Sequence, residues 1–151
     1  METFEHILET QGTLIYTNTG DSMMPLIKQG RDIIVIERKP EGRLKRLDIP
    51  LYRRDTDPPG KYVLHRILWV RKNDYLISGD NRRNLERGIT DRHIIGVLKA
   101  MVRDGKEIDL KSNWKYKLYS HIWCDLYPIR YCIFFVRDGV RKMLRIVKNE
   151  E

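Results

Sequence analysis

The chain has 151 residues, of which 41% are hydrophobic and 33% charged, a composition that fits one domain with its own core. The formal charge of +8 permits a phosphate-bearing partner, but no helix-turn-helix, zinc-finger or aromatic RNA-binding signature accompanies it. We therefore expect no nucleic-acid partner. Neither a basic-then-apolar leader nor a run of about 18 apolar residues is visible, so we expect a cytoplasmic protein, with peripheral membrane contact as an open alternative.

The two cysteines, Cys124 and Cys132, both lie among apolar residues of the C-terminal third. This setting favours free thiols over a disulfide. Two cysteines alone do not make a structural zinc site, and we expect neither a metal nor a cofactor.

Short apolar runs separated by turn residues occupy the first two thirds of the chain. Their patterning predicts a helix at residues 3–10 and then strands at 13–19, 32–37 (a β-branched, buried run), 48–53, 62–70 (the longest), 75–77, 94–102 and 106–110. Residues 55–60 carry a strong turn signal, and Asp104-Gly105 is a well-matched hairpin turn. Many short strands at close spacing indicate a mainly β fold.

The character of the chain changes at about residue 111, where tryptophan and tyrosine alternate with lysine and arginine. Helical spacing of apolar residues predicts one or two amphipathic helices that break near Pro128. We therefore divide the chain into a β domain, 1–110, and a C-terminal helical extension, 111–151. The extension either packs on the β core or lies on an anionic membrane surface, where basic residues and interfacial aromatics are common.

The segment Thr-Gly-Asp-Ser-Met-Met-Pro at residues 19–25 is the most informative part of the chain. Gly20 permits positive φ, and Pro25 favours extended geometry at Met24. Such a turn presents the hydroxyl of Ser22 at the surface while the methionines anchor it from below. The alternative is an ordinary turn serine.

A serine hydroxyl needs a nearby base to act as a nucleophile. Of the four histidines, only His65 lies inside a strongly patterned apolar strand, where the polar pair His65-Arg66 costs burial energy unless the site is polar. A hydrogen-bonded, half-buried histidine is the structural alternative. A carboxylate that orients the imidazole completes such a site. We favour Asp80, which follows a strand in a tight turn, over Glu86, whose neighbour Arg87 offers an exposed ion pair.

Five motifs in order resemble those of type I signal peptidases and the related LexA-like self-cleaving repressors. They are Gly20–Pro25, Gly30–Val35, Val63–Ile67, Ser78–Asn81 and Ile95–Val97. The match covers roughly residues 12–102 and implies a coiled antiparallel β-sheet catalytic domain. It also implies that Ser22 is the nucleophile and His65 the general base, as in the archaeal and endoplasmic-reticulum branch that carries histidine.

The same resemblance implies further roles. In that branch an acidic residue in or after Gly-Asp-Asn completes the site, which leaves Asp80 and Glu86 as candidates. The backbone N–H of Ser22 is the expected oxyanion donor, and Gly20 stands where some relatives carry a second donor, a serine. The following positions, Met23, Met24 and Pro25, are candidate substrate contacts.

The resulting hypothesis is a serine endopeptidase. Its substrate is an extended segment of a precursor, leader or signal-like peptide docked along a β edge. The alternative is a non-catalytic or self-cleaving LexA-like regulatory or dimerisation module. The oligomeric state stays open at this point.

Overall fold

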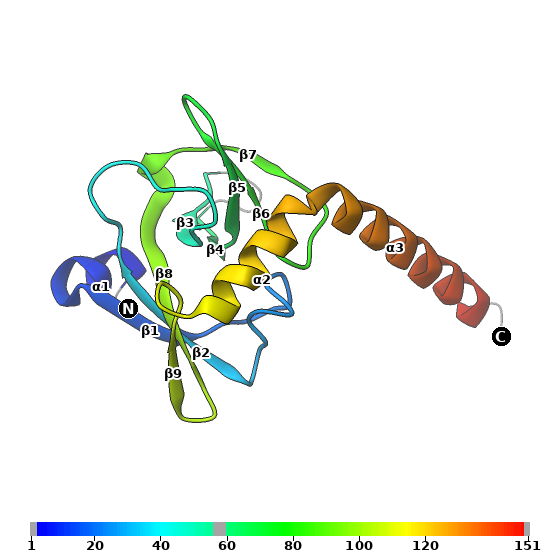
Figure 1. Ribbon diagram of the computed structural model, residues 1–151, viewed down its shortest axis with the longest axis horizontal. Coiled ribbons are helices and arrows are strands. Elements are labelled where there is room, and N and C mark those ends of the chain that lie inside the picture. The colour runs from blue at the N-terminus through cyan, green and yellow to red at the C-terminus, as the bar shows by residue number, and fades with distance from the viewer. Residues whose placement is uncertain (1–2, 56–59, 150–151) are drawn as a thin grey trace.

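The structure is a computed structural model that describes residues 3–55 and 60–149. Antiparallel strands form the body, and two helices follow at the C-terminal end (Figure 1). The elements are α1 (Phe4–Gln11), β1 (Thr13–Thr17), β2 (Asp32–Arg38), β3 (Pro50–Arg53), β4 (Tyr62–Leu64), β5 (Arg66–Val70), β6 (Tyr75–Ser78), β7 (Glu86–Ile89), the 3₁₀ helix η1 (Asp91–His93), β8 (Ile94–Arg103), β9 (Lys106–Asp109), α2 (Trp114–Asp125) and α3 (Tyr127–Asn149). The predicted β-rich body with C-terminal helices is confirmed at this level.

Two sheets share the body. The larger has the order β1-β2-β8-β3-β4, with β9 also pairing with β8, and the smaller has the order β5-β6-β7. All of the strand pairs are antiparallel. Among the described residues, strand β4 pairs with β3 alone, which leaves its other edge without a strand partner.

The strand predicted over residues 62–70 is two strands in different sheets. Strand β4 pairs with β3 and strand β5 pairs with β6, so the chain passes between the sheets at His65. The longest strand is therefore β8, not this segment. Strand β7 was not predicted, because Glu-Arg-Gly-Ile has no alternating pattern and belongs to a sheet edge. Most of the predicted turn at 55–60 lies outside the described residues.

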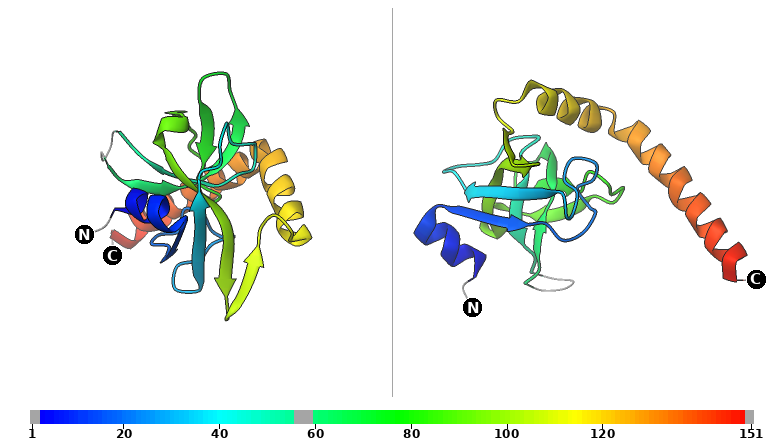
Figure 2. Two further views of the ribbon diagram at one scale, coloured as in Figure 1. Left: turned by 90° about the vertical axis from the view of Figure 1, so that its left-hand side faces the viewer. Right: turned by 90° about the horizontal axis from the view of Figure 1, so that it is seen from below.

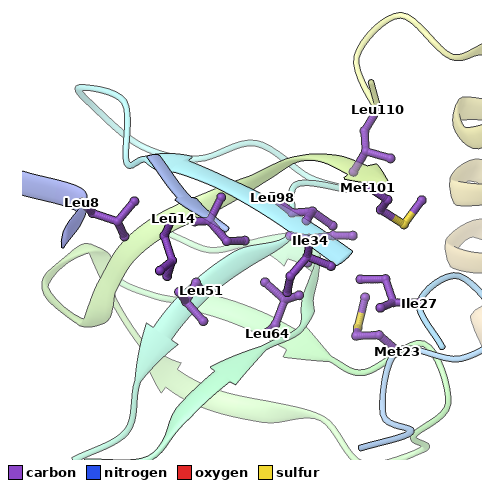
Figure 3. Close-up of a cluster of buried hydrophobic side chains, with 12 residues drawn as sticks. Leu8, Leu14, Met23, Ile27, Ile34, Leu51, Leu64, Leu98, Met101 and Leu110 are labelled. Carbon is purple, nitrogen blue, oxygen red and sulfur yellow. The ribbon is translucent and has the colours of Figure 1, made fainter. Parts of the chain in front are cut away.

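The main core lies between α1 and the strands of the larger sheet, and the segment after Ser22 contributes to it. Figure 3 shows Met23 and Ile27 beside Ile34, Leu64 and Met101. Strand β2 is buried on one face only, because Ile34 is fully buried whereas 40% of the surface of Ile33 is exposed. The strand was predicted to be buried, and this holds for one of its faces.

The C-terminal helices begin after β9 and break at Leu126, two residues before Pro128, as predicted. Cys124 of α2 and Tyr127, the first residue of α3, pack on Leu68 of the body in a small cluster. Helix α3 extends away from the body, as the right-hand view in Figure 2 shows. Cys124 is buried, Cys132 is exposed, and both are free thiols. Within the described ranges, no helix is both long and apolar enough to cross a membrane.

Candidate active site

The turn that carries Ser22 is tied to the loop that follows β6. The N–H of Asn81 donates to the carbonyl of Ser22 at 2.8 Å, and the Asn81 side-chain amide donates to the carbonyl of Asp21 at 3.1 Å. Arg82 forms an ion pair with the Asp21 carboxylate. Met23 anchors the turn from below, because its side chain is fully buried in the core. Two segments nearly sixty residues apart in sequence are therefore held together beside Ser22.

The three residues after Ser22 do not line the cleft into which Ser22 faces. Met23 is fully buried, which differs from its predicted role as a substrate contact. Met24 is half-buried and Pro25 exposed, and none of the three lines the cleft that contains Ser22. Gly20 does line that cleft, and its φ of 111° is a conformation that favours glycine, as the predicted turn requires.

Ser22 and His65 line the same cleft, which has a volume of about 290 Å³. One wall is the loop of residues 18–22, and the opposite wall is residues 61–65, which include strand β4. The side chains of Arg54 and Arg82 complete the lining. The open edge strand of the larger sheet therefore borders the space that both candidate residues face.

Gly79 lies between the Ser22 turn and the His65 imidazole. A Cβ atom at this position would lie 2.6 Å from the carbonyl oxygen of Ser22 and 3.1 Å from Nε2 of His65. Real Cβ atoms do not approach a backbone oxygen so closely, so a side chain here displaces at least one of these groups. The absence of a side chain at Gly79 permits the close approach of serine turn and imidazole.

The other ring nitrogen of His65 faces a carboxylate. Nδ1 lies 2.9 Å from Oε1 of Glu86 and 3.3 Å from the hydroxyl of Tyr52. The Tyr52 hydroxyl donates to Oε2 of Glu86 at 3.0 Å, and the Arg54 guanidinium donates to both carboxylate oxygens. His65 itself is buried, with 7% of its surface exposed.

These contacts determine the charge of Glu86. Burial alone raises its pKa, but hydrogen bonds from His65 and Arg54 outweigh burial and lower the pKa to about 2. An ionised carboxylate only accepts hydrogen bonds, so Nδ1 of His65 carries the proton. Nε2, on the side of Gly79 and the Ser22 turn, is then free to accept a proton from a hydroxyl.

Asp80 forms no hydrogen bond or ion pair with His65. Its carboxylate binds the Arg66 guanidinium through two hydrogen bonds of 2.8 Å, and both side chains are fully buried. The carboxylate partner of His65 is Glu86, which reverses the preference for Asp80. The exposed ion pair expected between Glu86 and Arg87 does not form. Glu86 is instead half-buried and forms an ion pair with Arg54.

Helix α2 covers the Arg66–Asp80 ion pair. Arg66 donates to two hydroxyls of this helix, and Asp80 accepts from a third hydroxyl and, through its backbone carbonyl, from an indole N–H. The four residues are Tyr116 and Ser120 on Arg66, and Tyr119 and Trp123 on Asp80. Because Gly79 and Asn81 flank Asp80, the helical extension holds the loop that positions Ser22.

Sequence reasoning did not find Tyr52 or Arg54. Tyr52 is a fully buried strand residue whose pattern reads as core, and Arg54 belongs to a run of charged residues after β3. Nothing in the neighbouring sequence distinguishes either residue, since both contact Glu86 only because β7 approaches β3.

Within the described part of the chain, the N–H of Ser22 has no hydrogen-bond acceptor. The same residues contain no cluster of three histidine, cysteine or carboxylate side chains placed to hold a metal ion.

In comparisons with known proteins, no protein-family model and no curated protein matches this chain. Its function is therefore inferred from the geometry of the cleft together with the ordered motifs of the sequence.

Proposed function

We propose that this protein is a serine endopeptidase of the signal-peptidase-like type, with Ser22 as nucleophile and His65 as general base. The observation that carries the proposal is that Ser22 and His65 line the same cleft, while Glu86 binds Nδ1 of the imidazole. The antiparallel β body is compatible with the signal peptidase and LexA-like fold that the motifs imply.

In the proposed reaction, Nε2 of His65 accepts the hydroxyl proton of Ser22 while the serine oxygen attacks the scissile carbonyl. Glu86 stabilises the imidazolium that forms, and the imidazolium then gives the proton to the leaving amine. The N–H of Ser22, which has no acceptor among the described residues, donates to the developing oxyanion. Gly20 has no hydroxyl, so its side chain supplies no second donor.

The substrate we propose is an extended peptide segment, as in a precursor, leader or signal-like peptide. Strand β4 has one open edge, and its residues Tyr62–Leu64 line the cleft directly before His65. A peptide that pairs with this edge has its backbone register fixed by main-chain hydrogen bonds. That register brings one of its carbonyls next to Ser22.

The test is cleavage of a mixed-sequence peptide library, with products read by mass spectrometry. We expect the native chain to cleave internal bonds, Ser22→Ala to be inactive, and the exposed control Ser112→Ala to retain full activity. Circular dichroism confirms that each variant is folded. Cleavage by Ser22→Ala at the native rate contradicts the proposal. Cleavage of the chain itself, with no cleavage of added peptides, favours the self-cleaving regulatory module instead.

A further inference from the structure

Helix α3 contacts the body with its arginine and aromatic side and leaves its apolar side exposed. Tyr127, Arg130 and Phe134 are buried against the body, and the Arg130 guanidinium lies over the rings of Tyr127 and Phe134. The opposite side carries apolar residues that are each exposed over half or more of their surface: Ile129, Ile133, Val136, Val140 and Met143. This is the reverse of a helix that packs on its own core.

The apolar side continues onto α2. Trp114, Leu118, Ile122 and Leu126 follow each other at intervals of four residues, and each is exposed over nearly half of its surface or more. The N–H of Leu126 donates to the carbonyl of Ile122, and the N–H of Arg130 donates to the carbonyl of Leu126. Helical hydrogen bonds therefore continue across the break between α2 and α3, and the apolar side continues from one helix to the other. We call these nine exposed apolar residues of α2 and α3 the apolar row. They are Trp114, Leu118, Ile122, Leu126, Ile129, Ile133, Val136, Val140 and Met143.

Basic residues accompany the apolar row. Residues 111–149 contain nine lysines and arginines but only two acidic residues, Asp125 and Asp138. Both aspartates already pair within the chain, with Arg46 and Arg137 respectively. Other basic residues of the two helices are exposed and have no acidic partner among the described residues: Lys115, Lys117, Arg141, Lys142 and Arg145.

We propose that the apolar row inserts into the surface of an anionic membrane, with α2 and α3 lying in the interface. A long apolar face that includes Trp114, on helices with uncompensated positive charge, is the pattern of an interfacial helix. Anionic headgroups neutralise the basic residues while the acyl region accepts the apolar side chains. The helices lie on the outside of the body (Figure 2).

The charge pattern favours a membrane over a second copy of the chain. Two α3 helices packed through their apolar rows bring two positively charged helices together, and within residues 111–149 both aspartates are already paired. Like charges across an interface oppose association. The proposal does not depend on peptidase activity, because it concerns a surface formed by the helices alone.

The experiment is sedimentation of the full chain with phosphatidylglycerol or phosphatidylcholine vesicles at low and high salt. We expect binding to phosphatidylglycerol vesicles that weakens as salt rises, and little binding to phosphatidylcholine. Charge reversal at Arg141, Lys142 and Arg145 to Glu should weaken binding by about a hundredfold or more, since each basic residue contributes about fivefold. The double variant Val136→Glu/Val140→Glu should weaken it by about tenfold or more per residue.

Matched controls make the same charge changes elsewhere on the molecule. Lys72→Glu/Lys99→Glu/Lys106→Glu uses exposed lysines of the β body, and Ile15→Glu/Val70→Glu uses exposed apolar strand residues. Both controls should bind vesicles within about threefold of the native chain, apart from the general effect of net charge. Absence of vesicle binding by the native chain overturns the proposal, and so does equal loss in controls and helix variants. A dimer that Val140→Glu dissociates, without vesicle binding, assigns the row to a second copy instead.

Discussion

Nδ1 of His65 lies 2.9 Å from Oε1 of Glu86, and the two residues come from different parts of the two-sheet body. His65 stands where the chain leaves the larger sheet, between β4 and β5, and Glu86 begins the edge strand β7 of the smaller sheet. The candidate site therefore spans the junction between the sheets. Its geometry depends on how the sheets pack. Some substitutions at this junction are expected to lower activity, and others to lower stability.

Glu86→Gln is expected to lower peptide cleavage by about 10²- to 10⁴-fold while the chain stays folded. The glutamine amide donates as well as accepts, so it no longer holds the proton on Nδ1 of His65, and Nε2 loses its proposed role as a base. The rate of cleavage as a function of pH, measured with circular dichroism as a check on folding, tests this expectation. An unchanged rate shows that Glu86 does not orient the imidazole.

Asp80→Asn should act on stability before it acts on chemistry. The substitution leaves the fully buried Arg66 guanidinium without its counterion, and removal of one partner of a buried pair costs about 3–5 kcal/mol. Urea unfolding monitored by tryptophan fluorescence gives the loss directly. If Asp80→Asn lowers the rate per folded molecule more than Glu86→Gln does, Asp80 has the orienting role that the structure gives to Glu86.

Gly79→Ala should reduce cleavage by about 10²-fold, because displacement of reacting groups by about 1 Å has effects of that size. The added Cβ meets the carbonyl oxygen of Ser22 at 2.6 Å, so the serine turn or the His65 ring must move. Gly139→Ala is the matched control, since its Cβ meets nothing within 4 Å, and it should leave the rate unchanged. Equal rates for the two variants show that the close approach at Gly79 is not required.

The low pKa of Glu86 predicts a pH dependence of stability. The pKa falls from 4.5 to about 2 on folding, so Glu86 contributes stability above pH 4.5 that is lost as pH decreases toward 2. The contribution is about 3–4 kcal/mol, at roughly 1.4 kcal/mol per pKa unit. Urea unfolding of the native chain and of Glu86→Gln at pH 6, 4 and 2.5 should show the gap between them shrinking. A gap independent of pH contradicts the prediction.

Ser22→Ala, His65→Ala and the double variant should show nearly the same residual cleavage. Residues that act as one unit in a reaction give losses that do not add. The measured quantity is kcat/KM for one peptide substrate. If the two losses multiply in the double variant, Ser22 and His65 act independently, and their shared cleft has another use.

Several features of this protein were determined by local sequence. The helix α1, the β8–β9 hairpin with φ of 51° at Asp104 and 73° at Gly105, and the helix break near Pro128 all follow from neighbouring residues. The candidate pair Ser22 and His65 was also found from sequence, through the turn that carries one and the interrupted strand that carries the other. Periodicity and turn chemistry act over a few residues, so local sequence is enough for such features.

Tertiary structure alone decided which carboxylate meets His65. The register that pairs Ile77 with Glu86 brings β7 alongside β6 and carries Glu86 to the imidazole, while buried Arg66 binds Asp80. Strand register and the pairing of buried charges depend on residues that are distant in sequence. A buried guanidinium requires a nearby carboxylate, and Asp80, which does not line the cleft, meets that requirement. No local pattern distinguishes a carboxylate that balances a buried charge from one that orients a base.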